Sequence, residues 1–147
     1  MHNGRMYMDY NFAQRKSALE VLNNFHHHFK WPNGNEGKLL DIGSGSGDVL
    51  IELVVPKLPK TVKIYGTDVS AEMVKFAKQN FGTQVASFYQ ADISADYELL
   101  AKRLPQPFDN ITSFFCFHWI QNQRFVPLQF LYKIFLQPSS FLLHSIF

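Results

Sequence analysis

The chain has 147 residues, enough for one domain with a single hydrophobic core, and 46% of them are hydrophobic and 18% charged. This composition excludes disorder as the main state, and the thinly spread net charge of +2 lacks the basic runs of a nucleic-acid-binding protein. A single cysteine, an N-terminus unlike a signal peptide and the lack of a long apolar segment predict a soluble, cytoplasmic protein without disulfides.

Strand-like and helix-like patterns alternate along the chain. Apolar side chains at helical spacing predict an amphipathic helix over residues 13–29. The elements expected after it are a strand over 38–42, a helix over 49–55, a strand over 61–67, a helix that Ser70 caps, a strand over 85–91, a helix over 97–104 and a strand over 109–117. Such alternation is typical of an α/β fold whose parallel sheet is covered by helices on both faces.

A glycine-rich turn is the strongest local motif. Gly43, Gly45 and Gly47 follow the first expected strand and precede its helix. Glycine lacks a Cβ and tolerates positive φ, so a nucleotide-like ligand can lie against such a turn beside a helix N-terminus. A dinucleotide-binding fingerprint would need a glycine three residues after Gly45, where this chain has Asp48, which speaks against NAD. The alternative is a plain connecting turn.

Two aspartates end the next two expected strands. Asp68 comes about twenty residues after the turn, where its carboxylate can accept hydrogen bonds from both hydroxyls of a ribose. Asp92 ends the third strand. Because the carboxyl ends of parallel strands meet at one edge of the sheet, the glycine turn and both aspartates are predicted to surround one ligand site. A purely structural role, such as capping a helix, is the alternative for each aspartate.

These segments resemble the class I S-adenosylmethionine-dependent methyltransferases. The matching stretches are residues 41–47, 66–70 and 91–93. The resemblance implies a Rossmann-like, doubly wound, mostly parallel sheet and S-adenosylmethionine as cofactor. It implies that the glycine turn contacts the methionine part, that Asp68 binds the ribose and Val69 packs on adenine, and that Asp92 and Ile93 contact the adenine edge. The cofactor-binding residues it implies are Asp41, Gly43, Ser44, Gly45, Gly47, Asp68, Val69, Met73, Asp92 and Ile93.

Residues 13–16 and 108–121 narrow the resemblance to the insect juvenile hormone acid methyltransferases, and the similarity extends from about residue 7 to residue 124. It implies methyl transfer to the carboxylate of a lipophilic terpenoid acid, of the juvenile hormone acid or farnesoic acid type. It also implies that Gln14 and Trp119 hold that carboxylate.

Methyl transfer from a sulfonium to a carboxylate requires few catalytic groups on the protein. A carboxylic acid is already ionised near neutral pH, so no general base is needed, and orientation and exclusion of water supply most of the rate. Gln14 and Trp119 carry an amide N–H and an indole N–H, which orient a carboxylate with less charge neutralisation than a cation would. The alternatives are a solvated Gln14 and a Trp119 that only packs. His118 is expected to have no proton-transfer role.

Neither the histidine run nor the cysteine is expected to bind a metal. Adjacent helical residues point in different directions, so His26, His27 and His28 cannot converge on one ion and are expected at the surface. Cys116 lies in an apolar stretch and is expected to be a small buried hydrophobe.

The chain departs from the family pattern after Arg124. That pattern continues with a helix, a Pro-Gly-Gly turn, a fifth strand, a further helix and a closing hairpin. Here Pro127 breaks the start of the helix, and Ser139 and Ser140 stand where the glycine turn would be. The sequence therefore resembles a C-terminally truncated family member, and we expect an exposed sheet edge and an incomplete substrate pocket.

We expect one domain over residues 1–147, with its core over 36–124 and an atypical tail over 125–147. Two alternatives to a terpenoid acid methyltransferase stay open at this point. One is a catalytically silent fragment that binds S-adenosylmethionine, and the other is a methyltransferase for another small acid.

Overall fold

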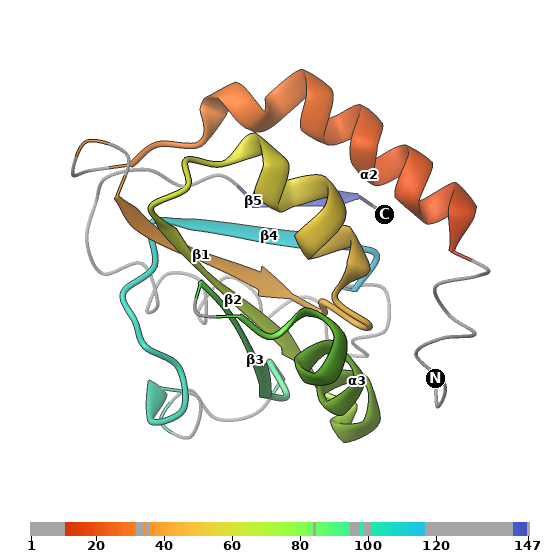
Figure 1. The fold of residues 1–147 in the computed structure, drawn as a ribbon, viewed down its shortest axis with the longest axis vertical. Coiled ribbons are helices and arrows are strands. Elements are labelled where there is room, and N and C mark those ends of the chain that lie inside the picture. The colour runs from red at the N-terminus through yellow and green to blue at the C-terminus, as the bar shows by residue number, and fades with distance from the viewer. Residues whose placement is uncertain are drawn as a thin grey trace.

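The computed structural model describes residues 11–31, 34, 36–83, 85–94, 98, 101–116 and 143–146. These residues form a five-stranded, all-parallel sheet with the strand order β3-β2-β1-β4-β5 (Figure 1). The strands are β1 (Gly37–Ile42), β2 (Val62–Asp68), β3 (Ala86–Gln90), β4 (Asn110–Phe114) and β5 (Leu143–Ile146). The expected Rossmann-like doubly wound fold is confirmed. The strand order reverses between β1 and β4, which is where ligands bind in open α/β sheets.

β5 comes from the segment that the sequence analysis treated as an atypical tail. Leu143–Ile146 pairs in parallel with β4, in a register that runs from Ile111 opposite Leu143 to Phe114 opposite Ile146. The tail therefore supplies a strand although it lacks the glycine turn of the family pattern, and β5 rather than β4 is the outer strand on this side of the described sheet. The physical reason is that the open edge of β4 presents unpaired backbone groups that another extended segment can satisfy.

The helices follow the expected positions with different ends. α2 (Phe12–Phe25) ends earlier than predicted and continues as the 3-10 turn η1 (His26–His28). The helix after the glycine turn contains the π-helical segment η2 (Leu50–Val54) and then the 3-10 turn η3 (Val55–Lys57), in which Pro56 stands in the first turn. α3 (Ala71–Phe81) begins where predicted, after Ser70.

Two other expectations are met only in part. Of the helix expected over 97–104, Glu98 and Ala101 are helical, and residues 99 and 100 lie outside the described part of the chain. The strand expected over 109–117 ends at Phe114, because Phe115 has a φ of 55° and turns the backbone out of the extended conformation. Residue 117 also lies outside the described residues.

The core occupies both faces of the sheet. On one face α2, η2 and α3 pack against the strands, with Ala18, Leu22 and Leu39 in the same apolar cluster (Figure 1). On the other face Leu40 packs with Phe108 and other apolar side chains. Leu39 and Leu40 are both fully buried, so the central strand β1 has no solvent-facing side, as expected for a parallel sheet.

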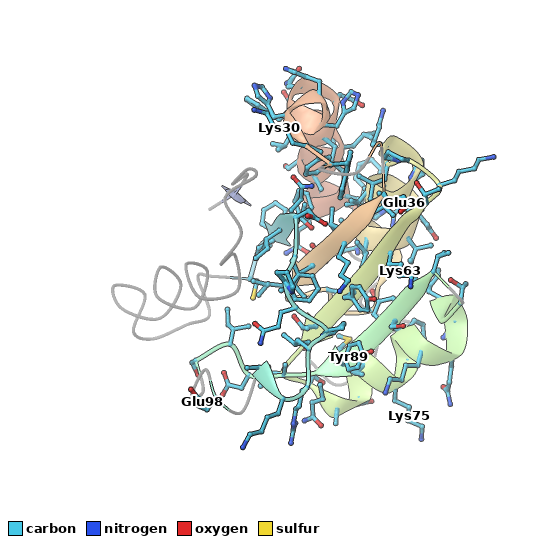
Figure 2. The ribbon with its side chains drawn as sticks, turned by 90° about the vertical axis from the view of Figure 1, so that its left-hand side faces the viewer. Lys30, Glu36, Lys63, Lys75, Tyr89 and Glu98 are labelled. Carbon is cyan, nitrogen blue, oxygen red and sulfur yellow. The ribbon has the colours of Figure 1, made fainter. Side chains whose placement is uncertain are left out.

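Charged side chains lie on the outside of this core. Lys30, Lys75 and Glu98 point away from the ribbon into solvent (Figure 2). None of the helices in the described part of the chain has the length and hydropathy needed to cross a membrane.

The start of α3 offers a direct test of the fold. The Ser70 hydroxyl accepts a hydrogen bond from the Met73 N–H at 3.3 Å, so Ser70→Ala should lower the free energy of unfolding by about 1 kcal/mol. Urea unfolding followed by circular dichroism measures this loss. Ser17→Ala is the matched control, because the Ser17 hydroxyl donates to the Ala13 carbonyl inside α2 and caps no helix. Equal losses in the two variants would contradict the capping role.

Candidate functional site

The glycine loop follows β1 at the point where the strand order reverses. Gly43, Gly45 and Gly47 have φ values of 72°, 54° and 86°, in the left-handed region that favours glycine. A Cβ on Gly43 would lie 2.4 Å from the Cys116 Sγ, and one on Gly47 would lie 3.0 Å from the Phe88 ring. The protein's own packing therefore requires glycine at both ends of the loop.

Hydrogen bonds hold the loop against the end of β2. The Ser44 N–H donates to the Thr67 carbonyl at 2.8 Å, and the Ser44 hydroxyl donates to the same oxygen at 3.3 Å. The Gly45 N–H donates to Asp68 Oδ2 at 2.9 Å. The structure thus brings together the glycine loop and the aspartate that the sequence analysis placed beside it.

Asp68 is half-buried and retains acceptor capacity. Its Oδ1 accepts a second backbone hydrogen bond, from the Ser70 N–H at 2.9 Å. A carboxylate oxygen has two lone pairs, so each oxygen can accept one more donor. Val69 follows with a side chain that is 63% exposed, and the Gln90 side-chain amide holds its carbonyl at 3.1 Å. This strand end therefore offers a fixed carboxylate beside exposed apolar surface.

The other cofactor-binding residues that the family resemblance implies at this edge of the sheet differ in the solvent exposure of their side chains. The exposed Asp92 Oδ1 accepts hydrogen bonds from the Ser94 N–H at 2.8 Å and from the Ser94 hydroxyl at 2.6 Å. The Ile93 side chain is buried in the core cluster with Leu40, and the Met73 side chain is buried at the start of α3. Asp92 thus presents a carboxylate at the surface, whereas Ile93 and Met73 have side chains withdrawn from solvent.

Asp41 lies beneath the loop at the end of β1 and is almost fully buried. Thr112, its register partner on β4, donates a hydroxyl hydrogen bond to Asp41 Oδ1 at 2.6 Å. Burial raises the pKa of Asp41 to about 7, although the Thr112 hydrogen bond opposes the rise, and the charge of Asp68 adds to it. The site thus contains a carboxyl group that changes charge near neutral pH.

A second carboxylate, Asp48, is not among the site residues predicted from the sequence. There its position only excludes a dinucleotide-binding fingerprint. Its side chain is 1% exposed and accepts hydrogen bonds from Ser46, from Arg15 and, at 3.0 Å, from the Asn11 amide. Burial opposes its ionisation, but these hydrogen bonds and the charge of Arg15 outweigh burial and hold the pKa of Asp48 below its usual range. No local pattern signals this cluster, because Arg15 and Asp48 are far apart in sequence.

Of the two residues that the resemblance implies for substrate binding, the structure describes only Gln14. Gln14 is half-buried on α2, on the same helical stripe as Asn11, Ala18 and Leu22, which faces the interior. Trp119 lies outside the described residues, as does His118. The pairing of Trp119 with Gln14 therefore stays a prediction.

Cys116 and the histidine run complete the set of predicted features. Cys116 packs against Gly43 just after β4, and burial, followed by the charges of Asp68 and Asp41, raises the pKa of its thiol to about 12. His27 and His28 are exposed, as expected, whereas His26 is half-buried. Within the described ranges, no three His, Cys, Asp or Glu side chains come close enough together to hold a metal ion.

The buried Asp41 predicts a pH-dependent stability. Its pKa is raised from 3.8 to about 7 on folding, so its contribution to stability is fully present below about pH 4 and is lost as the pH rises through about 7. Asp41→Asn keeps an acceptor for Thr112 without a charge to desolvate. The stability of the variant relative to the unaltered chain should therefore rise between about pH 4 and about pH 7, as measured by urea unfolding. Glu20→Gln, at an exposed position on α2, is the control, and a pH-independent difference for Asp41→Asn would contradict the raised pKa.

Two curated relatives share the sequence over most of this chain. The juvenile hormone acid O-methyltransferase of Drosophila melanogaster is 37% identical over 124 residues, which are 84% of this chain and 41% of the relative. The juvenile hormone acid O-methyltransferase of Bombyx mori is 33% identical over 125 residues, which are 84% of this chain and 43% of the relative. The chain thus spans about two fifths of the length of these relatives.

Solved structures agree with the fold. The plantazolicin methyltransferase BamL, in complex with a triazolic desmethylPZN analog and SAH, has a TM-score of 0.59 and 20% identity, and the match covers 88% of this chain and 45% of BamL. A SAM-dependent methyltransferase from Aquifex aeolicus has a TM-score of 0.58 and 21% identity, with 92% of this chain and 66% of that protein covered. At this identity the likeness establishes the fold.

The sequence model of a protein family described as "Methyltransferase domain" matches residues 40–135. The match begins inside β1, contains the glycine loop and continues past β4. Because it spans well over half of the chain, this chain belongs to the methyltransferase domain family.

Proposed function

We propose that this chain binds S-adenosylmethionine at the glycine loop and takes part in methyl transfer to the carboxylate of a lipophilic terpenoid acid, of the juvenile hormone acid or farnesoic acid type. The observation that carries the proposal is the hydrogen bond of 2.9 Å between the Gly45 N–H and Asp68, at the edge where the strand order reverses. This hydrogen bond holds the glycine loop, whose backbone a ligand can approach closely, beside the Asp68 carboxylate, which can accept hydrogen bonds from ribose hydroxyls. The sequence identity with two juvenile hormone acid O-methyltransferases supports the acid as substrate.

The residues at this edge fit such a cofactor in charge and shape. Asp68 has lone pairs for the two ribose hydroxyls, and the exposed Val69 offers apolar surface to the adenine. Asp92 would accept from the adenine edge, with Ile93 contributing its backbone because its side chain is buried. The Asp41 carboxyl beneath the loop, when ionised, complements the positive charge of the methionine part.

The main task of the protein in this reaction is to orient the substrate carboxylate toward the methyl group. Bound S-adenosylmethionine supplies an electrophilic methyl group on a sulfonium. The amide of Gln14 and the indole N–H of Trp119 would hold one carboxylate oxygen of the substrate in line with that methyl carbon, and the surrounding apolar side chains would exclude water. No residue has to remove a proton, because the substrate acid is ionised near neutral pH.

A second candidate function is cofactor binding without turnover. It stays open because the contacts at the glycine loop and Asp68 account for cofactor binding and not for binding of the acid. Calorimetric titration with S-adenosylhomocysteine, followed by a methyl-ester assay on farnesoic acid, separates the two. Binding with ester formation supports the methyltransferase, binding alone supports the second candidate, and no binding contradicts both.

The organisation of the chain forms a further part of the proposal. We propose that residues 1–147 act as one domain, in which the tail joins the sheet through β5. A cytoplasmic location and the lack of a nucleic-acid partner stay predictions from the composition.

The proposed ribose contact predicts a loss of cofactor affinity in Asp68→Ala. Removal of hydrogen bonds to a charged acceptor should weaken binding of S-adenosylhomocysteine by about 1.5 to 3 kcal/mol in a calorimetric titration. Glu72→Gln removes an acidic side chain from the exposed surface of α3 and should leave the affinity unchanged. Unchanged affinity in Asp68→Ala would remove Asp68 from the site.

The proposed carboxylate contact predicts a loss of turnover without a loss of cofactor affinity. In a protein that spans the full length of the relatives, Gln14→Ala and Trp119→Phe should each lower kcat/KM for farnesoic acid strongly. The two losses should be non-additive, because both donors would hold one carboxylate. Trp119→Phe keeps most of the ring packing and deletes the indole N–H, so near-normal turnover in this variant would leave only a packing role.

A further inference from the structure

An ion pair between the half-buried Arg15 and the buried Asp48 joins the N-terminal helix to the glycine loop. Asp48 is the residue directly after Gly47, and its buried carboxylate accepts hydrogen bonds from Ser46 inside the loop and from Arg15 and Asn11 at the start of α2. One carboxylate therefore contacts both segments. We call Asn11, Arg15, Ser46 and Asp48 the helix-loop junction.

The Arg15 guanidinium extends this contact along the helix that follows the loop. Its Nη1 donates to Asp48, and its Nη2 donates to Glu52 Oε2 at 2.7 Å. The planar guanidinium thereby fixes α2 relative to two carboxylates on successive turns. The Arg15–Asp48 contact is the more consequential of the two, since the side chain of Asp48 is 1% exposed and that of Glu52 is 44% exposed.

Gln14 precedes Arg15 on this helix. Asn11, Gln14, Arg15 and Ala18 share one stripe of α2 by their spacing of three and four residues, and all are buried or half-buried. Any shift of α2 against the loop therefore also displaces Gln14. The loop itself is held on its other side by Asp68 through the Gly45 N–H.

We propose that Arg15 and Asp48 are positioning residues that couple cofactor binding at the glycine loop to the docking of α2, the helix that carries Gln14. This inference rests on the proposed cofactor site. A ligand that orders the loop stabilises Ser46 and Asp48 in the arrangement that Arg15 requires, and a docked α2 stabilises the loop for the ligand. Such a coupling is reciprocal, so each event makes the free energy change of the other more favourable by the same amount.

The coupling differs from a purely structural role in a measurable way. A structural role lowers the stability of the folded chain and leaves the affinity of the folded molecules for the cofactor unchanged. Coupling lowers that affinity although Arg15 lies outside the proposed cofactor contacts, and it makes the protection of α2 depend on bound ligand.

The test uses this chain with S-adenosylhomocysteine as the ligand. Calorimetric titration should give Arg15→Gln an affinity lower by on the order of tenfold. Lys16→Gln is the matched control, because it removes a positive charge from the neighbouring, exposed position of α2 and should change the affinity by less than about twofold. Hydrogen exchange should slow in α2 on ligand binding in the unaltered chain and in Lys16→Gln, but not in Arg15→Gln.

Unchanged behaviour of Arg15→Gln would overturn the inference. If folded Arg15→Gln binds as tightly as the unaltered chain and gains the same protection in α2, the junction is only structural. If Arg15→Gln does not fold, Arg15→Lys replaces it, because Lys keeps the charge beside Asp48 but cannot contact both carboxylates through a planar fork. Its affinity should fall severalfold, and an unchanged value overturns the coupling. Failure of the unaltered chain to bind S-adenosylhomocysteine would contradict the cofactor site itself, and the coupling with it.

Discussion

Burial of the central strand β1 on both faces is the constraint on which the rest of this structure depends. Leu39 packs against the helices of one face and Leu40 against the opposite cluster, so the strand can meet a ligand only where it ends. Ile42, its last residue, is opposite Thr67 on β2 and Ser113 on β4. The chain turns here through the left-handed Gly43, whose backbone lies against Cys116.

Three carboxyl groups surround this turn, and their environments make them different. Asp41 is buried with one hydroxyl donor, which leaves its pKa near 7, whereas Asp48 is buried with a guanidinium and stays ionised. Asp68 is half-buried and is held by two backbone N–H groups. The result is a negative edge of the sheet that is suited to a ligand carrying positive charge, with one acid that anchors the N-terminal helix and one that is available to hydroxyl groups.

The N-terminal helix is part of this site although it precedes the sheet in the chain. Arg15 and Asn11 reach the loop through Asp48, and Ala18 and Leu22 extend the contact into the core. A buried carboxylate is costly to leave without its cationic partner, so the Arg15–Asp48 contact strongly favours this position of α2 against the loop. The arrangement holds the helix that carries Gln14, the proposed substrate contact, against the glycine loop although the two segments are far apart in sequence.

Much of this architecture could be predicted from the sequence alone, because it depends on local sequence patterns. Alternation of strand and helix periods predicted the parallel sheet, and the positions of the glycines and Asp68 predicted that they meet at one edge of the sheet. The tertiary structure decided what depends on distant partners. Pairing of Leu143–Ile146 with β4 depends on an open strand edge, and the role of Asp48 depends on Arg15, 33 residues away. The raised pKa of Asp41 likewise arises from burial between strands. Burial depends on how the whole sheet packs, so it cannot be predicted from any local segment of the sequence.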